Sequence, residues 1–260
     1  MLEYNRQLLN SCSNNAILLT IGDNVTFPCW YLQHIENVRT DITVLDANLI
    51  GTDWYPKYLR KENKIKLSLT DTQLDTTLYQ EWTKQTVTIT NPKDSSMQLS
   101  WTMPPVYNEK YIVRADIVIL DLLRTNYFKR DFYFTTRTDS SNNLFLEPNF
   151  KNEGLVDKVM PAKMQDDDLL FPSKNLKDYN IDNLTASEIQ NSTDVLLLLN
   201  EYRYAYAVPI RQLFNQGRMK EAKHLAEQMR QKFDIDKLPY NHDNTRQYFE
   251  MIFRILRVNE

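Results

Sequence analysis

The sequence predicts an α/β fold, with a mainly parallel sheet and flanking helices, followed by a helical tail. Two short apolar runs, Ala16–Ile21 and Ile42–Asp46, have the composition of buried strands. Between them, Thr26–Glu36 is a helical stretch of the length that joins neighbouring parallel strands. Apolar residues near the end of the chain recur at helical spacing. We therefore expect an α/β domain over 1–165, a linker over 166–186 and a helical tail over 187–260.

The first predicted strand, helix and strand form a right-handed βαβ unit, which makes the expected fold Rossmann-like. A turn, Gly22-Asp23-Asn24, follows the first strand, and Asp23, Asn24 and Thr26 are all residue types that cap helices. A second polar turn, Asn48–Asp53, follows the second strand. Along the connecting helix, we expect an inward-facing stripe made of Phe27, Trp30, Tyr31 and Ile35.

The middle of the chain adds further predicted elements. The runs Thr86–Thr90 and Met97–Thr102 predict a hairpin with a longer loop. Ala115–Asn126 is a predicted helix with Ile117, Leu120 and Leu123 facing inward, and Phe132–Thr135 is expected to add a parallel strand to the same sheet. The alternating stretch Leu155–Met160 predicts one more strand, at an edge of that sheet.

The predicted linker contains Pro172 and the acidic run Asp166–Asp168, and shows little periodicity. In the tail, Asp194–Asn215 is a predicted helix that Pro209 should kink or divide. Gly217 marks a turn into a second helix, where the small side chains of Ala222 and Ala226 allow close approach. The pair resembles a tetratricopeptide hairpin. One such hairpin cannot form a solenoid, so we expect it to pack on the α/β domain or to bind protein.

Composition excludes several classes of protein. The chain has 260 residues, 42% of them hydrophobic, and its net charge of -3 gives no reason to expect a nucleic-acid partner. No apolar run is long enough to span a membrane, and the amino terminus lacks the pattern of a signal peptide. Cys12 and Cys29 flank the first predicted strand. A bridge between them is conceivable, but two buried free thiols are the favoured interpretation.

The sequence contains no recognisable catalytic motif and predicts neither a cofactor nor a metal site. His34, His224 and His242 are far apart and have no partners at metal-ligand spacing. Adjacent parallel strands bring both polar turns to one sheet edge, where α/β folds bind ligands. The candidate ligand-binding residues there are Asp23, Asn24, Thr26, Asp53 and Trp54. The alternative is that Asp23 and Asn24 only cap the helix and that Trp54 is packed.

Several segments resemble one family in the same order. They are TIGDNVTFPCWYLQHIENVRTDITVLDANLIGTDWY from Thr20, then ADIVILDLLRTNYFKRDFYFTT, EGLVDKVMPAK and EYRYAYAVPIRQLFNQGRMKEAKHLAEQM. The chain is similar to the C-terminal part of a domain-of-unknown-function family of multi-spanning membrane proteins, whose membrane half resembles protein O-mannosyltransferases. Val25 replaces a second acid in the family's GDNDTFP turn. Tyr127–Asp131 stands where the family has Asn-Trp-Lys-Arg-Pro.

The resemblance implies an extracytoplasmic accessory domain, on the periplasmic side, that is non-catalytic by itself. Its expected partner is the membrane-embedded transferase half or another protein, with a glycan as a further candidate. Any glycosyltransferase activity belongs to the membrane half. Two alternatives stay open: an enzyme that acts on a sugar or nucleotide at the Asp23/Asp53 edge, and a protein-interaction scaffold that uses the helical tail.

Overall fold

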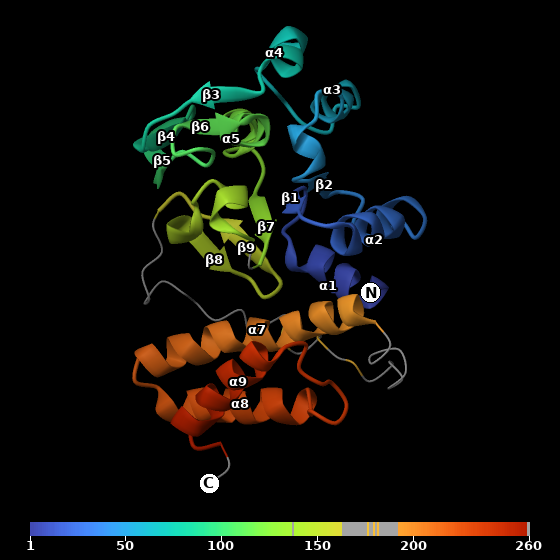
Figure 1. Cartoon of the computed structure of the whole chain (residues 1–260), viewed down its shortest axis with the longest axis vertical. Helices are drawn as coiled ribbons and strands as arrows, with labels where there is room; N and C mark the ends of the chain where they lie inside the picture. Colours follow the sequence, from blue (N-terminus) through green and yellow to red (C-terminus); the bar gives the residue numbers. More distant parts are fainter. Residues whose placement is uncertain (137, 163–175, 177–178, 180, 182–191, 259–260) are drawn as a thin grey trace. The chain divides into compact units, whose positions relative to one another are not determined.

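A computed structural model describes residues 1–136, 138–162, 176, 179, 181 and 192–258 (Figure 1). The chain divides into two compact units. The sheet unit comprises Cys12–Lys151 and Val156–Met164, and the helical unit comprises Met1–Ser11, Asn152–Leu155 and Gln165–Glu260. The predicted linker 166–186, with its acidic run, lies outside the described residues except for Leu176, Tyr179 and Ile181.

The sheet is five-stranded and mixed, with the strand order β2-β1-β7-β9-β8. β1 pairs in parallel with both β2 and β7, which confirms the predicted βαβ unit and the third parallel strand. β9 is antiparallel to β7 and lies inside the sheet, so the predicted edge position was wrong: the short strand β8 covers its outer side. The strand bounds are β1 Ile17–Thr20, β2 Thr43–Asp46, β7 Phe132–Thr135, β8 Phe150–Asn152 and β9 Val156–Val159.

Helices cover both faces of the sheet. Along β1, Ile17 and Leu19 belong to one buried cluster with Leu120 and Leu122 of α5 (Arg114–Asn126). The intervening strand positions face the other way, and Thr20 contacts Thr26 of α2 (Asp23–His34). Both predicted helices are thus confirmed. On α5 the buried side chains include Val118 and Ile119, whereas Ile117 is only half-buried.

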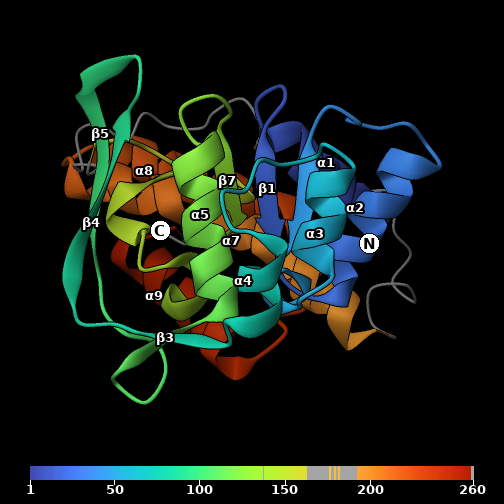
Figure 2. The same cartoon turned by 90° about the horizontal axis from the view of Figure 1, so that it is seen from above.

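β4 (Gln85–Asn91) and β5 (Asp94–Met103) form an antiparallel hairpin (Figure 2). Buried side chains of both strands belong to the same cluster. The hairpin's inward side chains alternate along both strands, as expected when one face is buried. The predicted longer loop is wrong, because Asn91 pairs with Asp94 and only two residues make the turn. Side-chain oxygens of these two residues accept the backbone N–H groups of Lys93 and Ser96, which tightens the turn.

Shorter elements complete the sheet unit. β3 (Tyr79–Glu81) pairs antiparallel with β6 (Tyr111–Val113). The remaining helical segments are η1 Leu49–Gly51, α3 Tyr55–Lys61, α4 Asp71–Thr76, η2 Ser140–Asn143 and η3 Glu147–Asn149.

The helical unit contains α1 (Leu2–Ser11), α7 (Thr193–Asn215), α8 (Met219–Lys232) and α9 (Asp243–Ile255). α7 and α8 form the expected pair around Gly217, and Ala222 and Ala226 are fully buried. α7 is not divided at Pro209: the helix continues through this buried residue, because packing offsets the lost backbone hydrogen bond. Across the described part of the chain, none of the helices combines the length and apolar character needed to cross a membrane.

Asp116 makes the stability of the sheet unit depend on pH. Its carboxylate is 4% exposed in the first turn of α5, where Oδ2 accepts the Val113 N–H at 2.8 Å. Burial raises the Asp116 pKa from its ordinary 3.8 to about 6. Because the folded state holds this proton more tightly than the unfolded state, folding is destabilised as pH rises from about 4 to about 6.

We expect Asp116→Asn to remove this penalty while keeping an oxygen that accepts the Val113 N–H. The variant should gain about 1–2 kcal/mol of unfolding free energy at about pH 7.5 and nothing at about pH 4. Urea unfolding at both pH values measures the difference. An equal shift at the two pH values would contradict a titration origin.

Candidate functional site

The carboxyl ends of β1 and β2 lie at the same edge of the sheet, since the two strands are adjacent and parallel. After β1, Gly22 adopts a positive φ of 90° and α2 begins at Asp23. After β2, the chain turns through Asn48 into η1 and reaches Trp54, which precedes α3. The predicted candidate residues are therefore all carried by segments that leave this edge.

Asp46, at the end of β2, holds these segments together. Its Oδ1 accepts the backbone N–H groups of Asn48 and Leu49 at 2.9 and 2.8 Å, and its Oδ2 accepts the Thr26 hydroxyl at 2.7 Å. The Thr26 hydroxyl also lies 2.8 Å from that of Thr20. Thr26 is thus a buried structural residue. Sequence reasoning missed Asp46, although an aspartate just before a polar turn is a signal for side-chain bonding to the turn backbone.

The capping interpretation of Asp23, Asn24 and Thr26 was wrong. The residue at the cap position is Gly22, which has no side chain to make the cap hydrogen bond, and the three predicted residues lie inside α2. Asp23 is exposed in the first turn of α2, where its charge interacts favourably with the helix dipole. Asn24 is half-buried, and Asp53 is exposed just before Trp54.

The expected inward stripe of α2 was also wrong. Phe27, Tyr31 and Ile35 are 50%, 46% and 64% exposed, and Trp30 is half-buried. The buried residues of α2 are Thr26, Cys29, Leu32 and Gln33. The hydrogen bonds of Thr26 to Asp46 and Thr20 fix the rotation of the helix and turn its aromatic face outward.

A groove of about 340 Å³ runs along the outer side of the edge strand β2, between α2 and α3. Aromatic rings form much of its wall. Trp30 donates its indole N–H to the Val44 carbonyl at 3.3 Å, and its ring lies 6.3 Å from that of Tyr55. Trp54 meets Tyr55 edge-on at 5.4 Å, and Tyr58 joins it in the lining.

Polar groups surround these rings. Gln33 donates to the Arg39 and Ile42 carbonyls at 2.8 Å each, which fixes the wall on the α2 side. His34, Thr40 and Lys64 line the groove and are exposed. The groove therefore combines the faces of two tryptophans with an imidazole, a hydroxyl and an ammonium group. Of the predicted candidate residues only Trp54 lies in its lining, and Asp23, Asn24, Thr26 and Asp53 are outside it.

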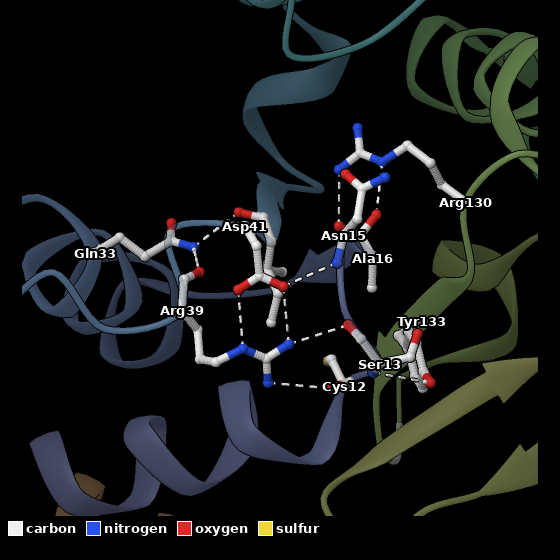
Figure 3. Close-up of polar contacts among 10 residues, drawn as sticks. Cys12, Ser13, Asn15, Ala16, Gln33, Arg39, Asp41, Arg130 and Tyr133 are labelled. Carbon is white, nitrogen blue, oxygen red and sulfur yellow. Dashed lines mark hydrogen bonds and ion pairs between the residues drawn. The ribbon is translucent and has the colours of Figure 1, made fainter.

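Two arginines form a separate polar cluster at the amino end of β1 (Figure 3). Arg39 pairs with Asp41 at 2.9 Å and donates to the carbonyls of Cys12 and Ser13 at 3.1 Å each. Hydrogen bonding to Arg39 lowers the Asp41 pKa to about 2. Arg130 likewise donates to protein carbonyls. The guanidinium groups hold backbone segments together, so this cluster has a structural role.

Within the described residues, no group of three or more His, Cys, Asp or Glu side chains is placed to hold a metal ion. Cys12 and Cys29 are buried free thiols, as favoured from the sequence, and burial raises the pKa of the Cys29 thiol above its ordinary value.

The fold and the groove define a mixed α/β domain that carries a helical unit. Comparison with protein families then identifies the family of the chain. The family model described as TMEM260-associated domain 2 matches residues 1–103 and, in an overlapping segment, 83–183. The chain belongs to this family, a domain of unknown function tied to membrane proteins. No curated protein and no solved structure matches the chain.

Proposed function

We propose that the sheet unit is a non-catalytic accessory domain that binds a saccharide in the groove beside β2. The observation that carries the proposal is the wall of Trp30, Trp54 and Tyr58, two of which expose about half of their side chains, at 53% for Trp54 and 51% for Tyr58. Such large exposed rings in a concave site are typical of ligand binding.

Saccharide chemistry fits the two kinds of group in the groove. The C–H faces of a pyranose ring pack on indole and phenol rings, while its hydroxyls need donors and acceptors at the rim. Lys64 supplies donors, and His34 and Thr40 supply both donors and acceptors. The Ile42 and Val44 carbonyls are already bonded to Gln33 and Trp30, so the wall is formed before a ligand binds.

A catalytic role has weaker support. Both carboxylate oxygens of Asp46 accept hydrogen bonds from the protein, so this buried acid serves the turn. The enzyme alternative rests on Asp23 and Asp53, and neither lines the groove. Glycosyl transfer is assigned to the membrane-embedded part that the resemblance to O-mannosyltransferase-like proteins implies. The domain then works on the extracytoplasmic side, beside that part.

The test is a glycan array printed with oligosaccharides of mannose, glucose and N-acetylglucosamine, followed by titration of the strongest ligand. Tryptophan fluorescence can report binding, because two of the four tryptophans line the groove. We expect Trp54→Ala to weaken binding by about tenfold or more, a loss of about 1.4 kcal/mol.

Tyr107→Ala is the matched control. Tyr107 is 48% exposed and stacks on Tyr79 at 6.2 Å, outside the groove. Its loss should leave glycan binding unchanged. A blank array, or equal affinity of wild type and Trp54→Ala, would exclude saccharide binding in this groove.

A further inference from the structure

The described lining of the groove beside β2 offers a ligand more hydrogen-bond donors than acceptors. Lys64 and Trp54 line the groove, and among the described residues neither side chain forms a hydrogen bond or an ion pair. An ammonium group and an indole N–H can only donate, whereas the side chains of His34, Thr40 and Tyr58 can donate or accept. Lys64 and Trp54 are both exposed, so a ligand can reach their donors.

The acceptors of the same wall are largely occupied by the protein itself. The Ile42 and Val44 carbonyls each accept a side-chain N–H from α2, at 2.8 and 3.3 Å. The Thr43 hydroxyl accepts a hydrogen bond from Arg130 Nη2 at 2.7 Å. Gln33 adds an amide oxygen, but this residue is only 8% exposed. A ligand that brings acceptors of its own therefore matches the groove better than one that brings donors.

The occupied carbonyls also disfavour an extended peptide as the ligand. A peptide that adds a strand to an exposed sheet edge binds through main-chain hydrogen bonds to that edge. Along β2, two of the carbonyls that such a strand would use are already bonded to α2 side chains. The groove therefore favours a ligand that binds through ring packing and contacts to side chains, as a saccharide does.

The backbone of Lys64 is fixed at the rim of the groove. Its N–H donates to the Leu59 carbonyl at 2.9 Å, and its carbonyl accepts Arg130 Nη1 at 2.8 Å. Trp54 precedes α3 and Lys64 follows it, and a helix of seven residues is about 10 Å long. The ammonium and indole groups are thus attached at opposite ends of α3, a spacing that suits an oligosaccharide.

We propose that the ligand of this groove is an acidic oligosaccharide, in which a uronate carboxylate pairs with Lys64 while a neighbouring pyranose ring packs on Trp54. This inference rests on the saccharide binding proposed above and adds the class of sugar. A carboxylate accepts hydrogen bonds through both oxygens and donates none, and its single charge matches one ammonium group. Each hydroxyl of a neutral sugar brings a further donor into a groove that already supplies donors.

Matched pairs of oligosaccharides test the role of the charge. Cellotetraose is paired with the glucuronate tetramer of the same linkage, and the corresponding mannose tetramer with its mannuronate tetramer. Within each pair, carboxylates replace the hydroxymethyl groups and the rest of the sugar is unchanged. In calorimetric titration of the full chain, we expect the acid of at least one pair to bind about tenfold more tightly in about 0.05 M salt. This advantage should shrink in about 0.5 M salt, because salt screens the ion pair.

Lys64→Met removes the ammonium group and keeps the apolar stem of the side chain. It should abolish the preference for the acid, while the affinity for the neutral tetramer changes by less than about twofold. Lys64→Arg keeps the charge and should keep the preference. Lys61→Met is the matched control, because Lys61 is exposed on α3, lies outside the groove lining and has no ion pair among the described residues.

The outcomes separate this inference from the one on which it rests. Equal binding of the acidic and neutral tetramers, with both lost in Trp54→Ala, would overturn the uronate assignment and leave saccharide binding in place. Equal binding of tetraglutamate and the acidic tetramer would also overturn it, since charge alone would then be recognised. If no tetramer binds, the uronate assignment is excluded, and the glycan array decides separately whether the groove binds other saccharides.

Discussion

Replacing Asp46 with alanine is expected to lower the free energy of unfolding of the sheet unit by about 3–5 kcal/mol. The substitution removes the acceptor for three donors at once: the Thr26 hydroxyl and the backbone N–H groups of Asn48 and Leu49. Asp46 is 3% exposed and Thr26 is fully buried, so solvent does not replace the partner that the Thr26 hydroxyl loses. Each buried group left without a partner costs about 1–3 kcal/mol.

Tryptophan fluorescence can measure this loss of stability. All four tryptophans, Trp30, Trp54, Trp82 and Trp101, belong to the sheet unit, so their fluorescence follows the unfolding of that unit in urea. Asp23→Ala is the matched control, because it removes an exposed aspartate with only a helix-dipole interaction of about 0.3–1 kcal/mol. Equal losses in the two variants would show that the Asp46 hydrogen bonds are unimportant.

The parallel half of the sheet was predictable from local sequence. β1, β2 and β7 are short apolar runs, and the stretch between the first two has helical length. Once those elements are assigned, handedness and adjacency follow from general rules of chain connection. The antiparallel part of the sheet depends on the pairing of β9 with β7 and β8, which no local sequence pattern specifies. β8 has only three residues, too few to show an alternation, and its presence moved β9 from the edge to the interior.

The orientation of α2 was not predictable from its composition. Aromatic residues usually face a core, and Phe27, Tyr31 and Ile35 occupy one side of the helix. The opposite side is buried because Thr26 bonds to Asp46, a residue twenty positions away whose role depends on the turn after β2. A polar contact between elements therefore overrode the hydrophobic pattern.

The sequence predicted only part of the candidate site, again because contacts between distant elements decide which side chains line the groove. The chain order places Trp54 at the carboxyl edge, and the structure puts its ring in the groove. Trp30 was assigned to the core together with the rest of the α2 stripe, and the groove wall that it forms was missed.

Arg130 provides the second large expected effect. Its Nε donates to the Asn15 carbonyl at 2.8 Å, and its Nη1 donates to the Lys64 carbonyl at 2.8 Å. Nη2 reaches the Ala16 carbonyl at 2.9 Å and the Thr43 hydroxyl at 2.7 Å. One guanidinium thereby joins the segment before β1, the first residue of β2 and the segment after α3. Figure 3 shows its bonds to Asn15 and Ala16. Burial lowers the Arg130 pKa from its ordinary value.

We expect Arg130→Met to lower the free energy of unfolding by about 2–4 kcal/mol, because four hydrogen bonds are lost while the apolar stem of the side chain is kept. The Ala16 and Lys64 carbonyls keep the Thr43 N–H and hydroxyl as donors. Arg130→Lys should recover little of this loss, since an ammonium group cannot reproduce the planar arrangement of donors that reaches three chain segments. Arg124→Met, at an exposed position of α5, is the control and should change stability by less than about 0.5 kcal/mol. Near-wild-type stability of Arg130→Lys in tryptophan-monitored urea unfolding would mean that charge alone, and not the fork of hydrogen bonds, stabilises the start of the parallel strands.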